Sequence, residues 1–320
     1  MKIARRVVLA TAMALAAFAR ASAQDWPTRN VTVVVPIPAG VASDIIARVV
    51  FEQVGRQVGE TFVIENRPGA GGTIGANMVA KAAPDGHTIL VYGSIAAANA
   101  LYAHLPYDTV ADFTPVVPFG ETPLVVVTAA GRYNTLAELI AAARARPDQL
   151  NYSTVGIGSA AHFGAVRLAV SAGFTAQHIP FKGPEWLADT IAGRVDFSVP
   201  PVTTVIGPIR DGKLKALAVG AAKRAASLPD VPTLIEAGLA ADAIYPFYTG
   251  AYLPSKTPRA IVDKLHDEVM AALALPSVQE RLAKIGVEKL PMTITEFDQF
   301  FKDDVANNLE LVKAANIPRQ

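Results

Sequence analysis

The chain has 320 residues, of which 51% are hydrophobic and 18% are charged, and its formal net charge is +1. A length of this order supports a sizeable core and more than one domain. The near-neutral charge argues against nucleic acid as a partner. Because the sequence has no cysteine, it excludes disulfides, thiol catalysis, cysteine-bound metals and a lipid anchor on cysteine.

The first 23 residues have the pattern of a secretory signal peptide. A basic start precedes the apolar run Val7–Ala19, which is too short to span a bilayer, and Ala21-Ser22-Ala23 resembles a cleavage site. The Arg5-Arg6 pair fits an ordinary basic start better than a twin-arginine signal. Cleavage near Ala23 leaves 25 basic residues against 28 acidic ones. No later apolar run reaches ~18 residues, so we expect a soluble protein exported to a bacterial periplasm.

The rest of the chain alternates between strand and helix patterns. Strands are predicted at Val31–Val35, Thr61–Glu65, Thr88–Tyr92, Phe113–Phe119, Leu124–Thr128, Leu150–Val155, Gln177–Phe181, Val195–Val199, Leu214–Val219 and Thr249–Leu253. Helices are predicted over Ser43–Val58, up to Ala83, from Gly93, from Leu136 to before Pro147, over Ala160–Ala172, Glu185–Ala192, Thr233–Gly238, Pro258–Leu275 and Ser277–Ile285, and from Thr293 onward.

This alternation predicts an α/β fold with mostly parallel sheets. Two halves rich in βαβ units fit the pattern better than one large sheet. We predict two lobes joined by two crossover strands, with residues 24–124 and 250–320 in lobe 1 and residues 125–249 in lobe 2. The late helices would return to cover lobe 1. Such a fold leaves a cleft at the carboxyl ends of the strands, where open α/β sheets bind ligands.

Two strand-to-helix turns carry the strongest sign of a binding site. The buried strand Val31–Val35 stops at Ile37-Pro38-Ala39-Gly40, and a helix follows at once. The strand Leu150–Val155 is followed in the same way by Gly156-Ile157-Gly158-Ser159. Free N–H groups and the positive end of the helix dipole make each turn an anion site. One turn in each lobe suggests two lobes that close on a carboxylate.

Other chemistries have weaker support. The run Gly156–Ala161 matches a dinucleotide fingerprint, but Gln177 and His178 stand where that fingerprint needs an acidic residue. The run Arg67–Thr73 lacks the end of a P-loop and fits a tight turn better. Ser159 and His162 lack an obvious third member of a catalytic triad, and for His162 a polar contact in the cleft and a structural cap are the two competing interpretations. The histidines are scattered, so no metal site is predicted.

Four further polar residues are candidates for the cleft. Asp44 lies in the first turn of its helix, where a carboxylate that only stabilises the dipole is the competing interpretation. Asp196 stands in a predicted strand, where Asp is disfavoured, and is the better candidate. Lys182 could offset ligand charge or be a solvated surface lysine. Ser94 could contact the ligand or cap a helix.

The sequence resembles the Bug/TctC receptors, which are periplasmic solute-binding proteins of tripartite tricarboxylate transporters. The resemblance covers nearly the whole chain after the signal peptide. It rests on motifs in the family's order: Pro36–Gly40 with Asp44, Glu65–Gly72 with Gly75, Ala83–Thr88, Leu105–Asp108, Tyr152–Ser153, Gly156–Ser159 with His162, Phe181–Gly183 and Leu228–Thr233.

The resemblance implies two lobes that grip one ligand carboxylate with backbone amides and ordered water. The gripping loops correspond to Ile37–Gly40 and Gly156–Ser159. It further implies no cofactor or metal, delivery to membrane transporter subunits, and a monomer. Ser94, His162, Lys182 and Asp196 lie where family pockets are often lined.

The chain departs from the family pattern where Val41 replaces a glycine and Ile37 an aromatic residue. With Phe247, these side chains suit an aromatic acid, whereas Asp196 in the cleft would favour a ligand amine. We expect an aromatic or dicarboxylic acid. An exported hydrolase that uses Ser159 and His162, and a ligand-sensing partner of a signalling receptor, are the alternatives.

Overall fold

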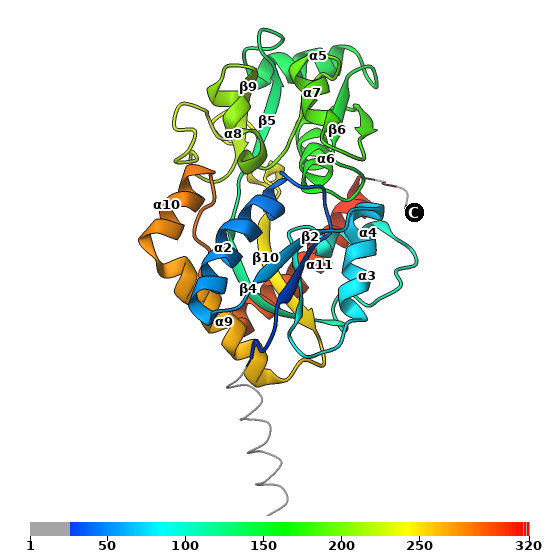
Figure 1. Cartoon of the computed structure of the whole chain (residues 1–320). Helices are drawn as coiled ribbons and strands as arrows, with labels where there is room; N and C mark the ends of the chain where they lie inside the picture. Colours follow the sequence, from blue (N-terminus) through cyan, green and yellow to red (C-terminus); the bar gives the residue numbers. More distant parts are fainter. Residues whose placement is uncertain (1–25, 316, 318, 320) are drawn as a thin grey trace, which may run out of the picture.

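The computed structural model describes residues 26–315, 317 and 319. The predicted signal peptide and its cleavage site near Ala23 lie outside these residues. The described chain forms two lobes, each built on one five-stranded sheet (Figure 1). The strand order is β2-β1-β3-β10-β4 in lobe 1 and β7-β6-β8-β5-β9 in lobe 2.

The elements follow the alternation that the sequence predicts. Lobe 1 contains β1 (Val31–Val35), β2 (Phe62–Asn66), β3 (Thr88–Tyr92), β4 (Phe113–Glu121), β10 (Tyr248–Pro254), α2 (Ala42–Val58), η1 (Ala70–Gly72), α3 (Thr73–Ala80), α4 (Ile95–Leu101), α9 (Arg259–Ala274), α10 (Pro276–Lys284) and α11 (Ile294–Ala314). Lobe 2 contains β5 (Leu124–Ala129), α5 (Leu136–Ala145), β6 (Asn151–Thr154), α6 (Ala160–Ala172), β7 (Gln177–Pro180), α7 (Glu185–Ile191), β8 (Phe197–Ser198), α8 (Val202–Arg210) and β9 (Leu214–Gly220), and the turn η2 (Ala241–Ala243) packs on α6.

Both sheets are mostly parallel, as predicted, and each has one strand that runs against its neighbours. In lobe 1 this strand is β10, and in lobe 2 it is β5. Each is the first strand after a crossover between lobes: β5 follows Thr122-Pro123, and β10 follows the segment 221–247. The predicted two-lobed α/β class is confirmed.

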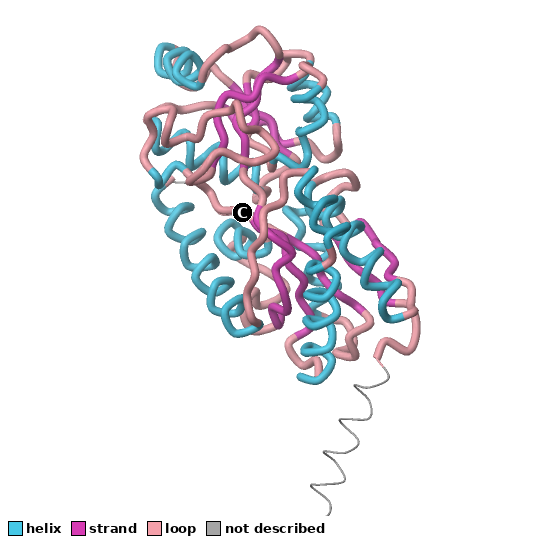
Figure 2. Tube along the Cα trace, turned by 90° about the vertical axis from the view of Figure 1, so that its left-hand side faces the viewer, coloured by secondary structure: helices cyan, strands magenta, loops and turns pink. Residues whose placement is uncertain are grey.

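Helices cover both faces of each sheet, because alternate strand residues point to opposite faces. In lobe 1, Val33 and Val35 pack with α2 and α9, whereas Val34 packs with α3, α4 and α11. In lobe 2, Val126 faces α5 and α6, and Val125 faces α7 and α8. Figure 2 shows the two sheets as separate bundles of strands, each enclosed by helices. The late helices do return to lobe 1, as predicted.

The two lobes touch each other across the cleft. One buried cluster joins Ala97 and Leu101 of α4 to Phe163 of α6 and Phe247 of the second crossover. The C-terminal turns of α11 add Leu311 and Val312 to the same cluster. The structure is therefore a closed arrangement with an apolar contact between the lobes.

Two predictions about local structure were wrong. No helix was expected between Val199 and Leu214, yet α8 forms there and carries Pro208 in its last turns. A proline near the end of a helix breaks few hydrogen bonds, and the β-branched residues in the rest of α8 have low helix propensity, so neither signals a helix in the sequence. The second error concerns Thr233–Gly238, which is a single turn and not a helix, although Thr233 and Glu236 form the reciprocal bonds of a capping box.

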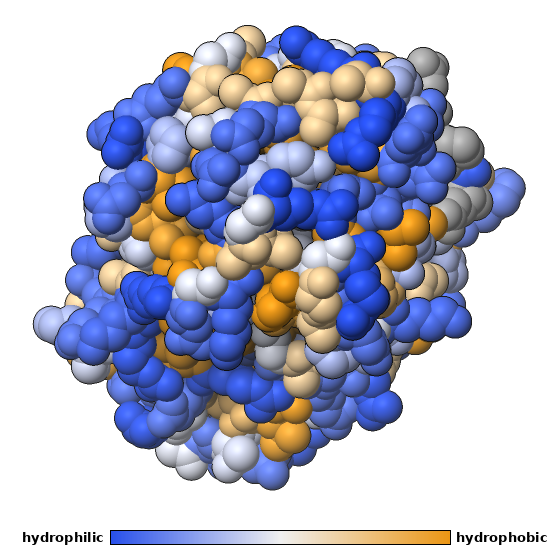
Figure 3. Space-filling view, turned by 90° about the horizontal axis from the view of Figure 1, so that it is seen from above, coloured by the Kyte–Doolittle hydropathy of each residue, from blue (hydrophilic) through white to orange (hydrophobic). Residues whose placement is uncertain are grey.

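The surface seen from the lobe 2 end is mostly hydrophilic, and its apolar patches are interrupted by polar residues (Figure 3). Among the residues that the structure describes, no helix combines the length and the apolar character needed to cross a bilayer.

Candidate functional site

The cleft between the lobes contains two adjoining cavities. The inner one has a volume of about 30 Å³, and the outer one, at the mouth, about 580 Å³. Ile37, Tyr92, Val155 and Ser159 line both. Each predicted loop therefore contributes residues to the boundary between the two cavities, and the two loops face each other from opposite lobes.

The first loop runs from the end of β1 into α2. Gly40 adopts a φ of 80°, which glycine tolerates and other residues rarely do. Val41 is extended, with φ −93° and ψ 163°, so its branched side chain causes no backbone strain there. Val41 is the N-cap of α2 and provides no side-chain cap, so the first amides of α2 remain available. Val41, Ala42 and Ser43 line the inner cavity.

Asp44 holds this loop in place and does not line either cavity. Its buried carboxylate accepts the Gly40 N–H at 2.9 Å, the Asn66 Nδ2–H at 3.0 Å and two contacts from Arg48 Nε at 3.1 Å. Burial acts to raise the pKa of Asp44, but the bonds from Arg48, Gly40 and Asn66 lower it below the usual value. Asp44 was predicted as a ligand-binding residue, but the structure makes it a positioning residue.

The second loop runs from the end of β6 into α6. Gly156 and Gly158 have φ of 122° and 84°, which only glycine adopts readily. Ser159 is the N-cap of α6: its Oγ donates to the Gly156 carbonyl at 2.8 Å and accepts the His162 N–H at 3.3 Å. The amides of Ala160 and Ala161 remain as first-turn donors, and both residues line the inner cavity.

A stack of aromatic side chains supports the second loop from behind. The His162 and His178 rings lie 4.3 Å apart, and Tyr152 stacks on His178 at 4.9 Å. His162 Nδ1 accepts the Gly158 N–H at 3.4 Å. His178 Nε2 lies 2.6 Å from Thr154 Oγ1, which in turn accepts the Gly156 N–H at 3.1 Å. His162, predicted to bind ligand, lines neither cavity and instead positions the loop.

Both histidines are neutral at ordinary pH. Burial, together with the neighbouring His178, lowers the pKa of His162 to about 3. Burial lowers the pKa of His178 to about 4. A neutral imidazole can accept the loop amide, whereas a protonated one could not. The second loop is thus oriented by neutral groups.

The inner cavity suits a single buried anion held without a cation. Of the described residues that line it, none is charged. The first residues of α2 and α6 reach it from opposite lobes, so two positive helix ends converge there. Ser94, predicted as a contact, also lines it, and its side chain makes no capping bond to α4.

Ser159 and His162 are not arranged as a nucleophile and base. The Ser159 hydroxyl proton goes to a backbone carbonyl, and His162 Nδ1 is occupied by the Gly158 amide. A general base must reach the proton that it removes. The geometry therefore does not favour the hydrolase alternative.

The remaining predicted residues lie at different distances from the cleft. Lys182 is exposed at the rim of the outer cavity. Asp196, a candidate for the cleft, lines neither cavity. It pairs with Arg132 and accepts the Asn151 N–H at 2.8 Å, at the start of β6. The ligand loop follows the other end of β6, so Asp196 lies at the far end of the sheet.

Several lining residues were missed from the sequence. The run Gly69–Gly72 lines the outer cavity with Tyr92 and Tyr102, and a Cβ on Gly71 would lie 2.7 Å from the Ile157 carbonyl. The glycines there permit this close approach of the lobes, which their number in the motif could have signalled. Trp186 and Thr204 line the inner cavity. Thr204 belongs to α8, the helix that the sequence did not reveal.

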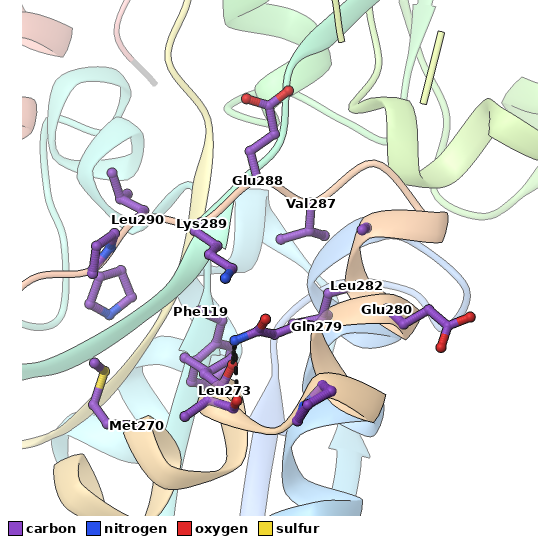
Figure 4. Close-up of a pocket in the computed structure, with 15 residues that line it drawn as sticks. Phe119, Met270, Leu273, Gln279, Glu280, Leu282, Val287, Glu288, Lys289 and Leu290 are labelled. Atoms are coloured by element: carbon purple, nitrogen blue, oxygen red, sulfur yellow. Dashed lines mark hydrogen bonds between the residues drawn. The ribbon is translucent and has the colours of Figure 1, made fainter. Parts of the chain in front are cut away.

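A separate apolar groove of about 530 Å³ lies within lobe 1, between α9, α10 and the segment 287–291. Figure 4 shows Phe119, Met270 and Leu273 facing this groove, whereas the carboxylates of Glu280 and Glu288 point away. It lacks any residue from lobe 2, so lobe closure would not enclose a ligand there. In the described part of the chain, no group of His, Cys, Asp or Glu side chains is arranged to hold a metal ion.

Comparison with known proteins identifies the family. The model of the tripartite tricarboxylate transporter family receptor matches residues 46–317. The chain belongs to this receptor family. It is 37% identical over 290 residues to the UPF0065 protein in the tcbD-tcbE intergenic region of Pseudomonas sp. strain P51, covering 89% of this chain and 86% of that protein. It is 32% identical over 289 residues to protein BugT of Bordetella pertussis, covering 89% and 88%.

Solved structures agree with this assignment. MatC from Rhodopseudomonas palustris with bound malate superposes with a TM-score of 0.84 at 33% identity, covering 90% of this chain and all of that one. An R. palustris protein with adipate gives a TM-score of 0.88 at 32% identity, covering 92% and all of that chain. Members of this family are solute-binding receptors, so the chain is a receptor and not an enzyme.

Proposed function

We propose that this receptor captures a small carboxylate in the periplasm and delivers it to the membrane subunits of a tripartite transporter. The observation that carries the proposal is the convergence of α2 and α6 on an uncharged inner cavity. Anions at helix N-termini gain about 0.3–1 kcal/mol each, and more when partly buried. Malate and adipate in the related structures support a carboxylate.

Binding would require the lobes to part. An inner cavity of about 30 Å³ holds ordered water but not an organic acid. A ligand would therefore enter while the lobes are apart and be enclosed when they close, with Thr122-Pro123 and the segment 221–247 as hinges. The protein would act as a monomer of two lobes, residues 24–124 with 250–320 and residues 125–249, after cleavage near Ala23.

The lining favours an aromatic or a dicarboxylic acid. Ile37, Val41 and Phe247 supply apolar walls, and Trp186 adds an aromatic one. These walls suit an aromatic body, whereas the relatives with malate and adipate support a dicarboxylic acid. Transport and ligand sensing would use the same cleft.

A thermal-shift screen of the mature protein tests the proposal. Carboxylates, amines and sugars are compared at equal concentration. A free ligand concentration of 100 times Kd adds about 2.7 kcal/mol to the free energy of unfolding, so a true ligand raises the melting temperature clearly. The proposal predicts shifts with carboxylates only. Shifts with amines or sugars and none with carboxylates would contradict it.

A further inference from the structure

One hydroxyl in the cleft has no partner. Thr204, in the first turn of α8, lines the inner cavity from lobe 2, and its Oγ1 is buried without a hydrogen bond. Two other serine hydroxyls of the lining are engaged. Ser43 bonds to Thr249 at 3.2 Å, and Ser159 donates to the Gly156 carbonyl. A buried unsatisfied hydroxyl costs free energy, which a ligand group bonded to it would recover.

The end of the cavity near Thr204 is not built for a second carboxylate. Two of the first amides of α8 are already bonded, Val202 N–H to the Pro123 carbonyl at 2.9 Å and Thr204 N–H to the Pro201 carbonyl at 3.0 Å. The neighbouring walls are Pro200, Pro201 and Trp186, and no lining residue of the inner cavity is charged. A second buried carboxylate there would lose its water without gaining a cation.

We propose that the ligand is a monocarboxylate whose far end is uncharged and carries a hydroxyl or carbonyl oxygen bonded to Thr204 Oγ1. The inference rests on the proposed function, in which the starts of α2 and α6 hold the ligand carboxylate and leave Thr204 for another group of the ligand. It selects between the two proposed classes: a hydroxylated or oxo-substituted aromatic or aliphatic acid is favoured over a dicarboxylic acid. Thr204 is then a residue that determines specificity.

Matched sets of three acids test the proposal by isothermal titration of the mature protein. The sets are butyrate, 4-hydroxybutyrate and succinate; hexanoate, 6-hydroxyhexanoate and adipate; and benzoate, 3-hydroxybenzoate and isophthalate. In the set that binds most tightly, the hydroxylated acid should bind about tenfold more tightly than the plain acid, as expected for one hydrogen bond. The hydroxylated acid should also bind more tightly than the dicarboxylate of the same set.

Two variants assign that preference to one atom. Thr204→Val should remove the tenfold preference, and Thr204→Ser, which keeps the hydroxyl, should retain most of it. Because Oγ1 makes no bond within the protein, Thr204→Val should not lower the melting temperature without ligand. A dicarboxylate that binds most tightly, or a hydroxyl preference that survives Thr204→Val, would overturn the inference. If no acid binds while amines or sugars do, the proposed function itself fails.

Discussion

The two loops that face each other across the cleft both lead from a strand into a helix, but they are held by different chemistry. The loop before α2 is braced by a buried carboxylate, Asp44, which is paired with Arg48. The loop before α6 is braced by neutral groups, the Ser159 hydroxyl and the His162 ring. Asp44 and His162 line neither cavity, whereas Ser159 lines both, so amides can be presented to an anion while the titratable groups stay behind them. In both loops, polar side chains next to the turn orient its backbone amides.

Removal of Asp44, the carboxylate that holds the loop before α2, should have the largest effect on stability and ligand affinity. Asp44→Ala deletes the partner of the Gly40 amide and the carboxylate bonds of Arg48 and Asn66, which should cost about 3 kcal/mol of unfolding free energy. Ligand affinity should also fall at least tenfold, because the loop loses its fixed shape. Chemical denaturation and titration measure the two effects. As a control, Arg48→Ala should cost about 1 kcal/mol, since that side chain is half exposed. Equal losses in both variants would contradict this division of roles.

The buried neutral histidines behind the second loop, His162 and His178, should make the stability of the protein depend on pH. In the unfolded chain the two histidines titrate near 6.5, whereas in the folded protein the pKa is about 3 for His162 and about 4 for His178 because they are buried. Only the unfolded state gains protons between these values, so stability is full above pH 6.5 and falls as the pH drops toward 4. The loss should approach roughly 3 kcal/mol for each histidine.

The variant His178→Gln isolates this contribution. It keeps a polar group for Thr154 but no longer titrates. The unfolding free energy of the wild type minus that of the variant should fall by roughly 3 kcal/mol from pH 7 to pH 4. A difference that stays constant over this range would show that His178 is not held neutral.

The N-cap of the second loop should contribute a smaller amount. Ser159→Ala should cost about 1 kcal/mol and weaken ligand binding, with no hydrolytic activity to lose. Thr135→Ala is a matched control, because Thr135 caps α5 in the same way, outside the residues that line the cleft. It should lower stability equally and leave affinity unchanged. Hydrolysis of an ester or amide by the wild type that vanishes in Ser159→Ala would contradict the receptor assignment.

The smallest effect on binding is expected at Asp196. Because it pairs with Arg132 at the far end of the sheet, Asp196→Ala should lower the melting temperature but change ligand Kd by less than about twofold. Titration of a carboxylate that binds the wild type measures this. A tenfold loss of affinity would mean that Asp196 acts on the cleft after all.

Much of the fold could be predicted because local signals agreed with it. The β-branched run Val31–Val35, the capping box at Thr293 and the terminal Gly173 each mark a boundary that the structure shows. Helix α8 was missed because Pro208 and the β-branched residues both argue against a helix by propensity. Local signals fail where packing against β9 decides the conformation.

The sequence was enough to predict the two loops that line the cleft, but not the other residues that line it. Turns such as Gly156–Ser159 depend on backbone geometry, which glycine and serine reveal in sequence. Whether a carboxylate such as Asp44 or Asp196 faces a cleft depends on partners far away in the chain, Asn66 and Arg132. Trp186 and Thr204 reach the cavity only through the arrangement of lobe 2. Such partners become visible only in three dimensions.

A crystal structure of the mature protein with a bound carboxylate tests the central claim most directly. We predict one ligand carboxylate between the loops, within hydrogen-bond distance of amides from the starts of both α2 and α6, with the lobes closed over it. A carboxylate that contacts only one lobe, pairs with Lys182 at the rim or lies in the groove between α9 and α10 would contradict the account.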